Sequence, residues 1–317
     1  MGIKKLNNYL LNNCSDHAIS RVPLSTFKGK NVVIDTSIYI YKFLSEDALL
    51  DNFYLMLSVF KQCQMTPIFV FDGKPPPEKC EVIWERINKR KEAEDKYNEM
   101  VEELNILELS DMDKQKKLEK LSGLKRQFVR VTDEHIQTLK QLFSNLNIQY
   151  IDAPSEADLM CAYLVKTRKV YACVSDDMDM FAYDCPYIIR KLSLTHHNCI
   201  SYHVNTIKQE LEVYDDLQST IILCGTDYNT DISWDIQIAL DRCKFYNNEK
   251  ERKQTTLGFY DWLLERCFID AQQKEKLDHV YSMFQVPKNM NIVHNVKQKS
   301  WTIIQPILEK EGFIFAN

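Results

Sequence analysis

Five apolar or strand-like segments of this chain each end at or near acidic residues, and that spacing limits the folds open to it. The first segment, Val32-Val33-Ile34, runs directly into Asp35. The carboxylates that follow the five segments are Asp35, Asp72, Glu156, Asp158, Asp177, Asp179 and Asp227. Ligands of open α/β sheets bind beyond the carboxyl ends of the strands. The pattern therefore predicts an α/β fold in which these acids share one site.

The chemistry of such a site follows from its charge. Carboxylates gathered together repel one another and are costly to desolvate, and divalent cations remove that cost. A set of hard oxygen ligands without Cys or His favours Mg²⁺, with Mn²⁺ as a substitute. A carboxylate site with two such ions most often hydrolyses phosphate esters. Any one of the acids alone is equally well read as a helix cap or turn residue, but seven together favour the metal site.

Composition excludes several classes of protein. No apolar run approaches 18 residues, so no membrane span is expected. The N-terminal residues lack the apolar core of a signal peptide. Ten cysteines show no CxxC pair and no zinc spacing, which predicts reduced thiols inside the cell. We expect the nucleus or, for a viral protein, a cytoplasmic replication site. The net charge of −5 argues weakly against nucleic-acid binding, but phosphate affinity depends on local basic patches.

The alternation of segments predicts the fold class: α/β, with a mainly parallel central sheet flanked by helices. Residues 1–225 are interpreted as the core, including a helical arch at about 78–130, and 226–317 as a C-terminal helical region. The helix that carries Glu156 and Asp158 is expected to take Ser155 as its N-cap. Predicted strands are 31–35, 66–71, 148–152, 170–175, 187–192 and, more weakly, 199–204. Predicted helices are 38–44, 51–63, 133–146, 155–167 and 205–224.

The charged segment after Asp72 separates its charges by sign. On a helix over 79–103, Lys79, Arg86 and Arg90 fall within about 20° of one line, and Tyr97 continues it. Five glutamates lie on roughly the opposite side, at 81, 85, 92, 99 and 103. A solvated helix with i,i+4 ion pairs is the simpler interpretation of such composition. The segregation favours a face that holds phosphates instead.

Six motifs, taken in order, resemble the flap endonucleases of the xeroderma G-type superfamily of structure-specific 5′ nucleases. The resemblance covers about residues 1–230. The motifs are Met1-Gly2-Ile3-Lys4-Lys5-Leu6, Ile34-Asp35-Thr36-Ser37, Val70-Phe71-Asp72-Gly73-Lys74-Pro75-Pro76, Asp152-Ala153-Pro154-Ser155-Glu156-Ala157-Asp158, Asp176-Asp177-Met178-Asp179 and Gly225-Thr226-Asp227-Tyr228. The resemblance implies a PIN-like nuclease that uses two Mg²⁺ ions.

By motif position, the acids would divide between the two metals. Those around the first would be Asp35, Asp72, Glu156 and Asp158. Those that place the second would be Asp177, Asp179 and Asp227. Asp158 stands where many relatives have Glu.

The resemblance also assigns basic and nucleic-acid-binding positions. Lys79 and Arg86 would be the catalytic basic residues, which neutralise the extra charge of the transition state. Arg90 would continue this face toward the arch, and Lys89 would also contact the nucleic acid. Tyr41 would stack on the base beside the scissile bond, and Gly2 would lie close to the DNA. The implied partner is DNA with a 5′ end, flap or branch, bound by a monomer.

Three departures from the family set limits on these expectations. Only 36 residues separate Asp35 from Asp72, where cellular relatives build a pocket for a one-nucleotide 3′ flap. Between Asp72 and Glu156 there are 83 residues, so the arch is long. Residues 229–236 contain no Gly, which disfavours the family's K⁺ site and its backbone grip on duplex phosphates. Residues 254–260 begin like a sliding-clamp peptide, but their aromatics fall one position early.

Two alternatives stay open. The same two-metal site would serve an endoribonuclease or a 5′ exoribonuclease, since some relatives cut RNA. A non-catalytic nucleic-acid scaffold is the other, and the presence of all seven acids argues against it.

Overall fold

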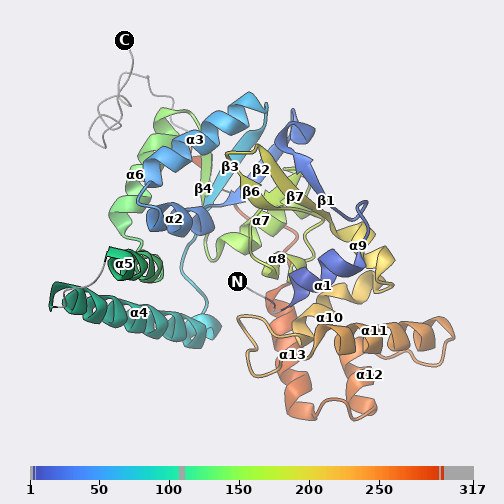
Figure 1. Ribbon diagram of the computed structural model, residues 1–317. Coiled ribbons are helices and arrows are strands. Elements are labelled where there is room, and N and C mark those ends of the chain that lie inside the picture. Colours follow the sequence, from blue (N-terminus) through green and yellow to red (C-terminus); the bar gives the residue numbers. More distant parts are fainter. Residues whose placement is uncertain (1–2, 4, 107–110, 293, 296–317) are drawn as a thin grey trace. The chain divides into compact units, whose positions relative to one another are not determined.

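The computed structural model describes the chain except for residues 1–2, 4, 107–110, 293 and 296–317 (Figure 1). Gly2, expected near the DNA, lies outside the described residues. Contacts group the chain into two compact units. Unit 1 comprises residues 1–35, 58–74 and 151–294; unit 2 comprises 36–57, 75–150 and 295–317. The sequence-based division at residue 225 stays a prediction.

The described residues form one sheet with the strand order β1-β7-β6-β5-β2-β3-β4-β8. Strands β2, β3, β5 and β6 pair in parallel, whereas β7 pairs antiparallel with both β6 and β1. The mainly parallel central sheet is therefore confirmed. Its strands are β1 (Ile19–Pro23), β2 (Asn31–Asp35), β3 (Thr66–Phe71), β4 (Gln149–Asp152), β5 (Ala172–Val174), β6 (Tyr187–Ser193), β7 (Asn198–His203) and β8 (His294–Asn295).

Two strands were not predicted, and both lie at the edges of the sheet. β1 reads Ile-Ser-Arg-Val-Pro, with only two strongly apolar residues, and its proline is tolerated because edge strands have unpaired N–H positions. β8 spans two residues within 226–317, the region that we interpreted as helical. Edge strands of this kind carry little of the apolar pattern from which strands are recognised.

The α-helices of the described residues are α1 (Leu6–Asn13), α2 (Thr36–Ser45), α3 (Leu49–Gln62), α4 (Cys80–Ile106), α5 (Asp111–Lys125), α6 (Asp133–Asn145), α7 (Ala157–Lys166), α8 (Asp179–Ala182), α9 (Val204–Glu210), α10 (Leu217–Leu223), α11 (Ile236–Glu251), α12 (Phe259–Glu265) and α13 (Ala271–Met283). The predicted helix over 205–224 is wrong in its middle. Glu212 and Tyr214 have positive φ values of 57° and 36°, and this left-handed backbone ends α9 before α10 begins.

The N-cap of α7 also differs from the prediction. Glu156, not Ser155, is the N-cap residue, and its side chain makes no capping hydrogen bond. The Glu156 carboxylate is therefore not committed to the helix backbone.

In unit 1, helices pack on the sheet and on one another around one core. Helix α7 contacts β2, β3 and β5. Helix α10 contacts α8, α11 and α13, and α11, α12 and α13 gather beside it (Figure 1, orange). The buried cluster extends from Ile3 to Phe284, so α10–α13 share the core of the sheet.

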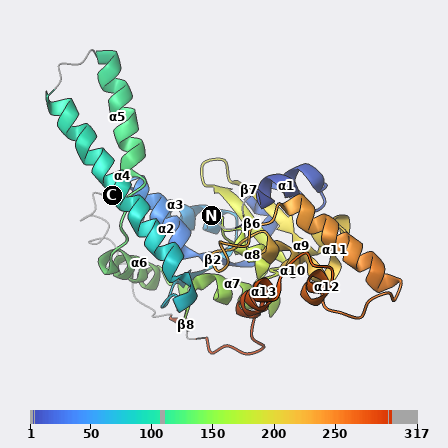
Figure 2. The ribbon, with the colours of Figure 1, turned by 90° about the horizontal axis from the view of Figure 1, so that it is seen from below.

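In unit 2, α4 and α5 contact each other as an antiparallel pair (Figures 1 and 2). This pair, with the short 3₁₀ helix η2 (Pro77–Lys79) before it, occupies the segment predicted as an arch. Within the described residues, no helix has both the length and the apolar character needed to cross a membrane. All ten cysteines are free thiols.

Candidate functional site

The parallel strands β2, β3 and β5 end at the same edge of the sheet. Asp35, the last residue of β2, is in register with Val70, and Ile34 is in register with Val174. Asp35 is buried, and the Ser175 hydroxyl donates a hydrogen bond to its Oδ2 at 3.3 Å. Because Asp72 follows β3 directly and Ser175 follows β5, three strand ends bring acids toward one edge, as the sequence predicted.

Asp72 is placed by a close approach of two chain segments. The Asp72 Oδ1 accepts a hydrogen bond from the backbone N–H of Ala157 at 2.8 Å. Next to it, the Gly73 N–H donates to the Ser155 carbonyl at 2.6 Å. A Cβ at position 73 would lie 2.2 Å from the Ala153 carbonyl oxygen, so only glycine fits here. The Asp-Gly pair therefore joins the end of β3 to the first turn of α7, where Asp158 lies.

Asp177 lies in the turn after β5, Asp179 begins α8 at the end of that turn, and both are buried. The Asp177 N–H donates to the Ser175 hydroxyl at 3.2 Å. The Asp177 Oδ1 in turn accepts from the Asp179 N–H at 3.1 Å. Ser175 therefore connects the Asp35 carboxylate with the turn that carries the next two acids.

Two tyrosines, the buried Tyr183 and the half-buried Tyr228, extend the acidic cluster. The Tyr228 hydroxyl donates a hydrogen bond to the Glu156 carboxylate. Burial, and then the charges of Asp158, Glu156 and Asp179, raise the pKa of Tyr183. Carboxylates from the start of α7 and from the turn after β5 therefore act on one phenol, which places them in the same neighbourhood. Asp227 is adjacent in sequence to Tyr228, so its backbone reaches this neighbourhood too.

The side chains do not, however, converge on a single point. In the part of the chain that the structure describes, no three Asp, Glu, His or Cys side chains form a group that could hold one metal ion. Several carboxylate oxygens instead accept hydrogen bonds from protein donors, as Asp72 and Glu156 do. Because carboxylates repel one another, their side chains also favour separate positions when no cation lies between them.

The donor chemistry nevertheless fits a hard divalent cation. Every predicted ligand is a carboxylate, the type that Mg²⁺ and Mn²⁺ prefer. Two thiols lie near Asp35 and Asp158, and burial raises the pKa of one, Cys161, to about 11. Burial also raises the pKa of the other, Cys173, well above its ordinary value. Both thiols are therefore protonated at neutral pH and do not compete as soft ligands.

The predicted basic residues lie in unit 2. Lys79 ends η2 and is buried, whereas Arg86 and Arg90 lie on α4. The Arg90 guanidinium lies 5.0 Å from the centre of the Tyr41 ring, a cation–π contact between two residues assigned to nucleic-acid binding. Tyr41 is 38% exposed, so part of its ring surface remains available to a ligand.

The segregation of charge along α4 is confirmed. The side of α4 that carries Arg86 and Arg90 is half-buried, and Lys79, just before the helix, is buried. On the same side, the ring centres of Tyr97 and Phe128 lie 5.3 Å apart. The five glutamates predicted on the opposite side are all exposed. Lys89 belongs to that exposed side, where it forms a surface ion pair with Glu85 at 3.5 Å.

Sequence reasoning missed a buried network behind Asp177. The Arg190 guanidinium, 5% exposed, donates to the Asp176 carbonyl at 2.7 Å and to the Asn7 side-chain oxygen. The Tyr202 hydroxyl also donates to Asn7, at 2.8 Å. The Lys191 N–H donates to the Asp176 carboxylate at 2.8 Å. An arginine inside the apolar strand 187–192 was the available signal. The network fixes the residue that precedes Asp177.

We therefore expect Arg190 to be a positioning residue. Arg190→Met would leave the Asp176 carbonyl and Asn7 without their donor and lower the free energy of unfolding by about 2–4 kcal/mol. If the Asp177 turn is displaced, a divalent cation held by the acids will bind more weakly. Arg190→Lys, which keeps the charge, should recover part of both effects. Urea unfolding and the rise in melting temperature on addition of Mg²⁺ measure them; lost stability with an unchanged response to Mg²⁺ would leave Arg190 a purely structural role.

Residues 225–234 form a loop where the family has its Gly-rich hairpin. Gly225 has a positive φ of 89°. The buried Asn229 accepts hydrogen bonds from the Thr226 N–H, at 2.9 Å, and from its hydroxyl. The Asn229 amide donates to the Ile222 carbonyl at 2.8 Å. Asn229 thus stabilises the loop from within.

Comparisons with known proteins agree on one family. A model of the XPG N-terminal domain matches residues 1–93, and a model of the XPG I-region matches residues 147–227. Together these matches span more than half of the chain and contain all seven acids.

Similar sequences are flap endonucleases. Flap endonuclease 1 of Xenopus tropicalis is 30% identical over 248 residues, which cover 72% of this chain and 61% of the frog protein. Flap endonuclease 1 of Komagataella phaffii is 34% identical over 252 residues, which cover 72% of this chain and 63% of the yeast protein. The chain thus spans about three fifths of the length of these relatives.

Solved structures also share the fold of this chain. The catalytic core of Rad2 in complex with a DNA substrate matches with a TM-score of 0.65 and 20% identity, covering 98% of this chain and 95% of that one. Flap endonuclease-1 from Methanococcus jannaschii matches with a TM-score of 0.60 and 23% identity, covering 94% and 91%. At this identity the likeness establishes the fold, the PIN-like arrangement predicted from the sequence.

Proposed function

Because the chain belongs to the XPG-type flap endonuclease family, we propose that it is a metal-dependent, structure-specific 5′ nuclease that hydrolyses DNA phosphodiesters. The main support for this proposal is the set of carboxylates at one edge of the unit 1 sheet, which occur in the order and sequence context of the family motifs. The expected setting is DNA replication, repair or recombination inside the cell.

We assign the acids to two metal ions, as the motifs imply. Asp35, Asp72, Glu156 and Asp158 would hold the first, and Asp177, Asp179 and Asp227 the second. Two Mg²⁺ ions bound there would supply an activated water and offset the charge that develops on the leaving oxygen. The protein contributes the placement of the carboxylates. Two of them, Asp72 and Asp177, are oriented by hydrogen bonds that they accept from the backbone N–H groups of Ala157 and Asp179.

Lys79 and Arg86 would neutralise the negative charge that the phosphate gains in the transition state. Lys79 follows Asp72 by seven residues, so chain length alone keeps the two within about 25 Å. Tyr41, Lys89 and Arg90 would contact the nucleic acid. Gly2 retains this role only as a sequence-based proposal.

The proposed partner is DNA with a 5′ end, a flap or a branch, bound by a monomer. A cleavage assay in Mg²⁺ tests this proposal. Matched 5′-flap, blunt-duplex, single-stranded DNA and single-stranded RNA substrates would be compared and their products sized. We expect the 5′ flap to be cut fastest. Preferential cleavage of RNA would instead establish the ribonuclease alternative, and binding of all four without cleavage would establish the scaffold.

Substrate choice within DNA gives a further prediction. The 36 residues between Asp35 and Asp72 leave little chain for a 3′-flap pocket, and the Asn229 side chain is committed to its own loop. A double flap with one unpaired 3′ nucleotide should therefore be cut within about twofold of a plain 5′ flap. Affinity should fall steeply with salt, because the basic residues of α4 would supply the grip. Rates at fixed ionic strength, repeated with a blocked 5′ end, provide the measurement. A strong preference for the one-nucleotide 3′ flap would mean that another segment rebuilds the pocket.

A further inference from the structure

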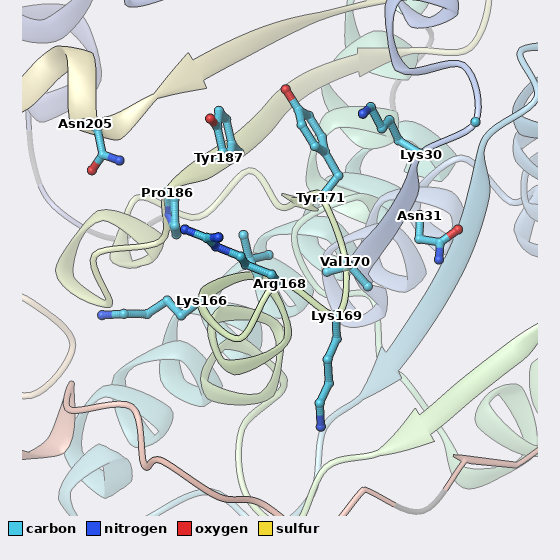
Figure 3. A pocket seen from close by; sticks show the side chains of 12 residues that line it. Lys30, Asn31, Lys166, Arg168, Lys169, Val170, Tyr171, Pro186, Tyr187 and Asn205 are labelled. Carbon is cyan, nitrogen blue, oxygen red and sulfur yellow. The ribbon is translucent and has the colours of Figure 1, made fainter.

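A hollow of about 580 Å³ lies in unit 1 at the end of the sheet opposite the acids (Figure 3). Asn31 begins β2, Tyr187 begins β6, and Tyr171 directly precedes β5. The Tyr171 N–H donates to the Asn31 carbonyl at 2.8 Å, which joins two of these segments. Along β2, Asn31 is about 13 Å from Asp35, the length of four residue steps. A ligand here would be distinct from one held at the carboxylates.

The lining of this hollow, which we call the basic pocket, is positively charged. It includes Lys30, Lys166, Arg168 and Lys169 and contains no acidic residue, although the chain as a whole carries −5. Lys166 lies 3.8 Å from the Asp184 carboxylate, but Lys208 is closer to that group, at 2.6 Å. One carboxylate therefore lies beside two lysines and cannot neutralise both, so the pocket keeps a positive charge.

Arg168 is the most informative of these residues. It follows the end of α7 with a left-handed backbone, φ 58°, a position that normally takes Gly or Asn. Its side chain extends toward Pro186, whereas that of Lys169 points away (Figure 3). The helix dipole favours a cation at this end of α7 and would explain Lys166 alone. It does not explain why Lys30, from a separate segment, lines the same hollow.

Two tyrosines form a wall of the basic pocket. The Tyr171 and Tyr187 rings stack with centres 4.9 Å apart and planes 19° apart. The Lys30 ammonium lies 5.0 Å from the Tyr171 ring centre, and the His203 ring meets Tyr187 edge-on at 5.1 Å. Since both rings already have partners, they do not offer an open platform for a nucleobase. The pocket is suited to recognise charge and hydrogen-bond acceptors.

We propose that the basic pocket binds closely spaced phosphates, as in the polyphosphate chain of a nucleoside triphosphate or the phosphorylated 5′ end of an oligonucleotide. Its volume falls within the range of about 300–1,000 Å³ usual for small-ligand sites. Arginine and lysine from separate segments give the charge-assisted hydrogen bonds that phosphate oxygens accept. An acidic peptide carries its charges further apart, whereas Lys30, Lys166 and Arg168 line one compact hollow. This site goes beyond the proposed nuclease function and does not depend on it.

Calorimetric titration of the full chain tests the proposal. The buffer would contain EDTA, so that no divalent cation bridges phosphates to the carboxylates, and have low ionic strength. The probes are ATP, tripolyphosphate, and one oligonucleotide with either a 5′ phosphate or a 5′ hydroxyl. We expect ATP and tripolyphosphate to bind with similar affinity, because the phosphates rather than the base are recognised. Arg168→Gly should weaken both at least about tenfold, and Lys30→Gln should weaken them less.

Lys253→Gly is the matched control. Lys253 is also exposed and left-handed, with φ 57°, but it does not line the basic pocket. Glycine suits both backbones, so neither substitution should harm folding. Wild-type affinity in Lys253→Gly, together with the loss in Arg168→Gly, supports the site. Equal losses in the two variants would reveal non-specific charge attraction and overturn it.

Three other results would also overturn the proposal. These are no binding of any probe, unchanged affinity in Arg168→Gly, and equally tight binding of an acidic peptide of the same charge. Binding of the oligonucleotide only when it carries the 5′ phosphate would identify a nucleic-acid end as the ligand. Binding of ATP but of neither oligonucleotide would identify a free nucleotide. Flap cleavage by Arg168→Gly should proceed at the wild-type rate, so failure of the nuclease proposal would be seen separately, in the wild-type protein.

Discussion

Asp177→Ala and Asp72→Ala are each expected to lower the cleavage rate in Mg²⁺ at least about a thousandfold while substrate binding survives. Asp177 is buried in the turn after β5, and Asp72 follows β3 at the same edge of the sheet. Removing either carboxylate would leave a cation with too few oxygen ligands. The lost stabilisation of transition-state charge, several kcal/mol, would fall on the chemical step. Single-turnover rates and substrate dissociation constants, measured side by side, give the two quantities.

A readout independent of activity strengthens this test. Mg²⁺ that binds the folded state alone raises the melting temperature of the wild-type protein. The rise should be smaller in Asp177→Ala and should persist in Asp16→Ala, which changes an exposed acid of the same unit outside the cluster. Without metal, Asp177→Ala should unfold no more easily than the wild type, because one source of repulsion is gone. Cleavage at the wild-type rate in either site variant would refute the two-metal assignment.

The placement of Asp35 and Asp72 at one edge of the sheet could be predicted from the sequence because strand ends are set by local pattern. Runs such as Val32-Val33-Ile34 are too apolar to be edge strands, so parallel pairing follows. Parallel pairing then places Asp35 and Asp72 at one edge without knowledge of any distant contact. The charged face of α4 could also be predicted from the sequence, because helical periodicity depends only on spacing within the segment.

The features that escaped prediction depend on contacts between distant segments. Arg190 holds Asp176 only because β6 lies beside β5, and its partner Asn7 lies 183 positions earlier in the sequence. The Glu156–Tyr228 hydrogen bond joins residues 72 positions apart. The N-cap of α7 was misplaced by one residue for a related reason. Gly73 and Ser155 pair through their backbones, which leaves Glu156, the residue after Ser155, to serve as the N-cap.

The basic pocket escaped prediction for a further reason. Each of its cations has an ordinary local explanation, such as a helix end for Lys166. Only the fold shows that Lys30 and Arg168, far apart in sequence, line one hollow. The sequence-based expectation of basic residues was confined to the segment after Asp72, because there the charges repeat on one helix.

Lys79→Ala and Arg86→Ala should each lower the single-turnover cleavage rate about 10²–10³-fold and change the substrate dissociation constant much less. An interaction that forms mainly with the transition state acts on the chemical step, whereas a ground-state phosphate anchor acts on binding. The burial of Lys79 favours the first behaviour, since a charge away from water interacts more strongly with the phosphate it faces.

The two residues need a control from the same helix. Lys91 is an exposed lysine of α4, so Lys91→Ala removes one positive charge from the element without touching the Lys79–Arg86–Arg90 side. We expect it to cut at nearly the wild-type rate at saturating substrate. Arg86→Lys should recover only part of the rate, because lysine keeps the charge but lacks the planar fork of donors. If Lys79→Ala and Arg86→Ala instead bind weakly and cut at an unchanged rate at saturation, both residues are phosphate anchors. The catalytic charge would then have to come from the metal ions alone.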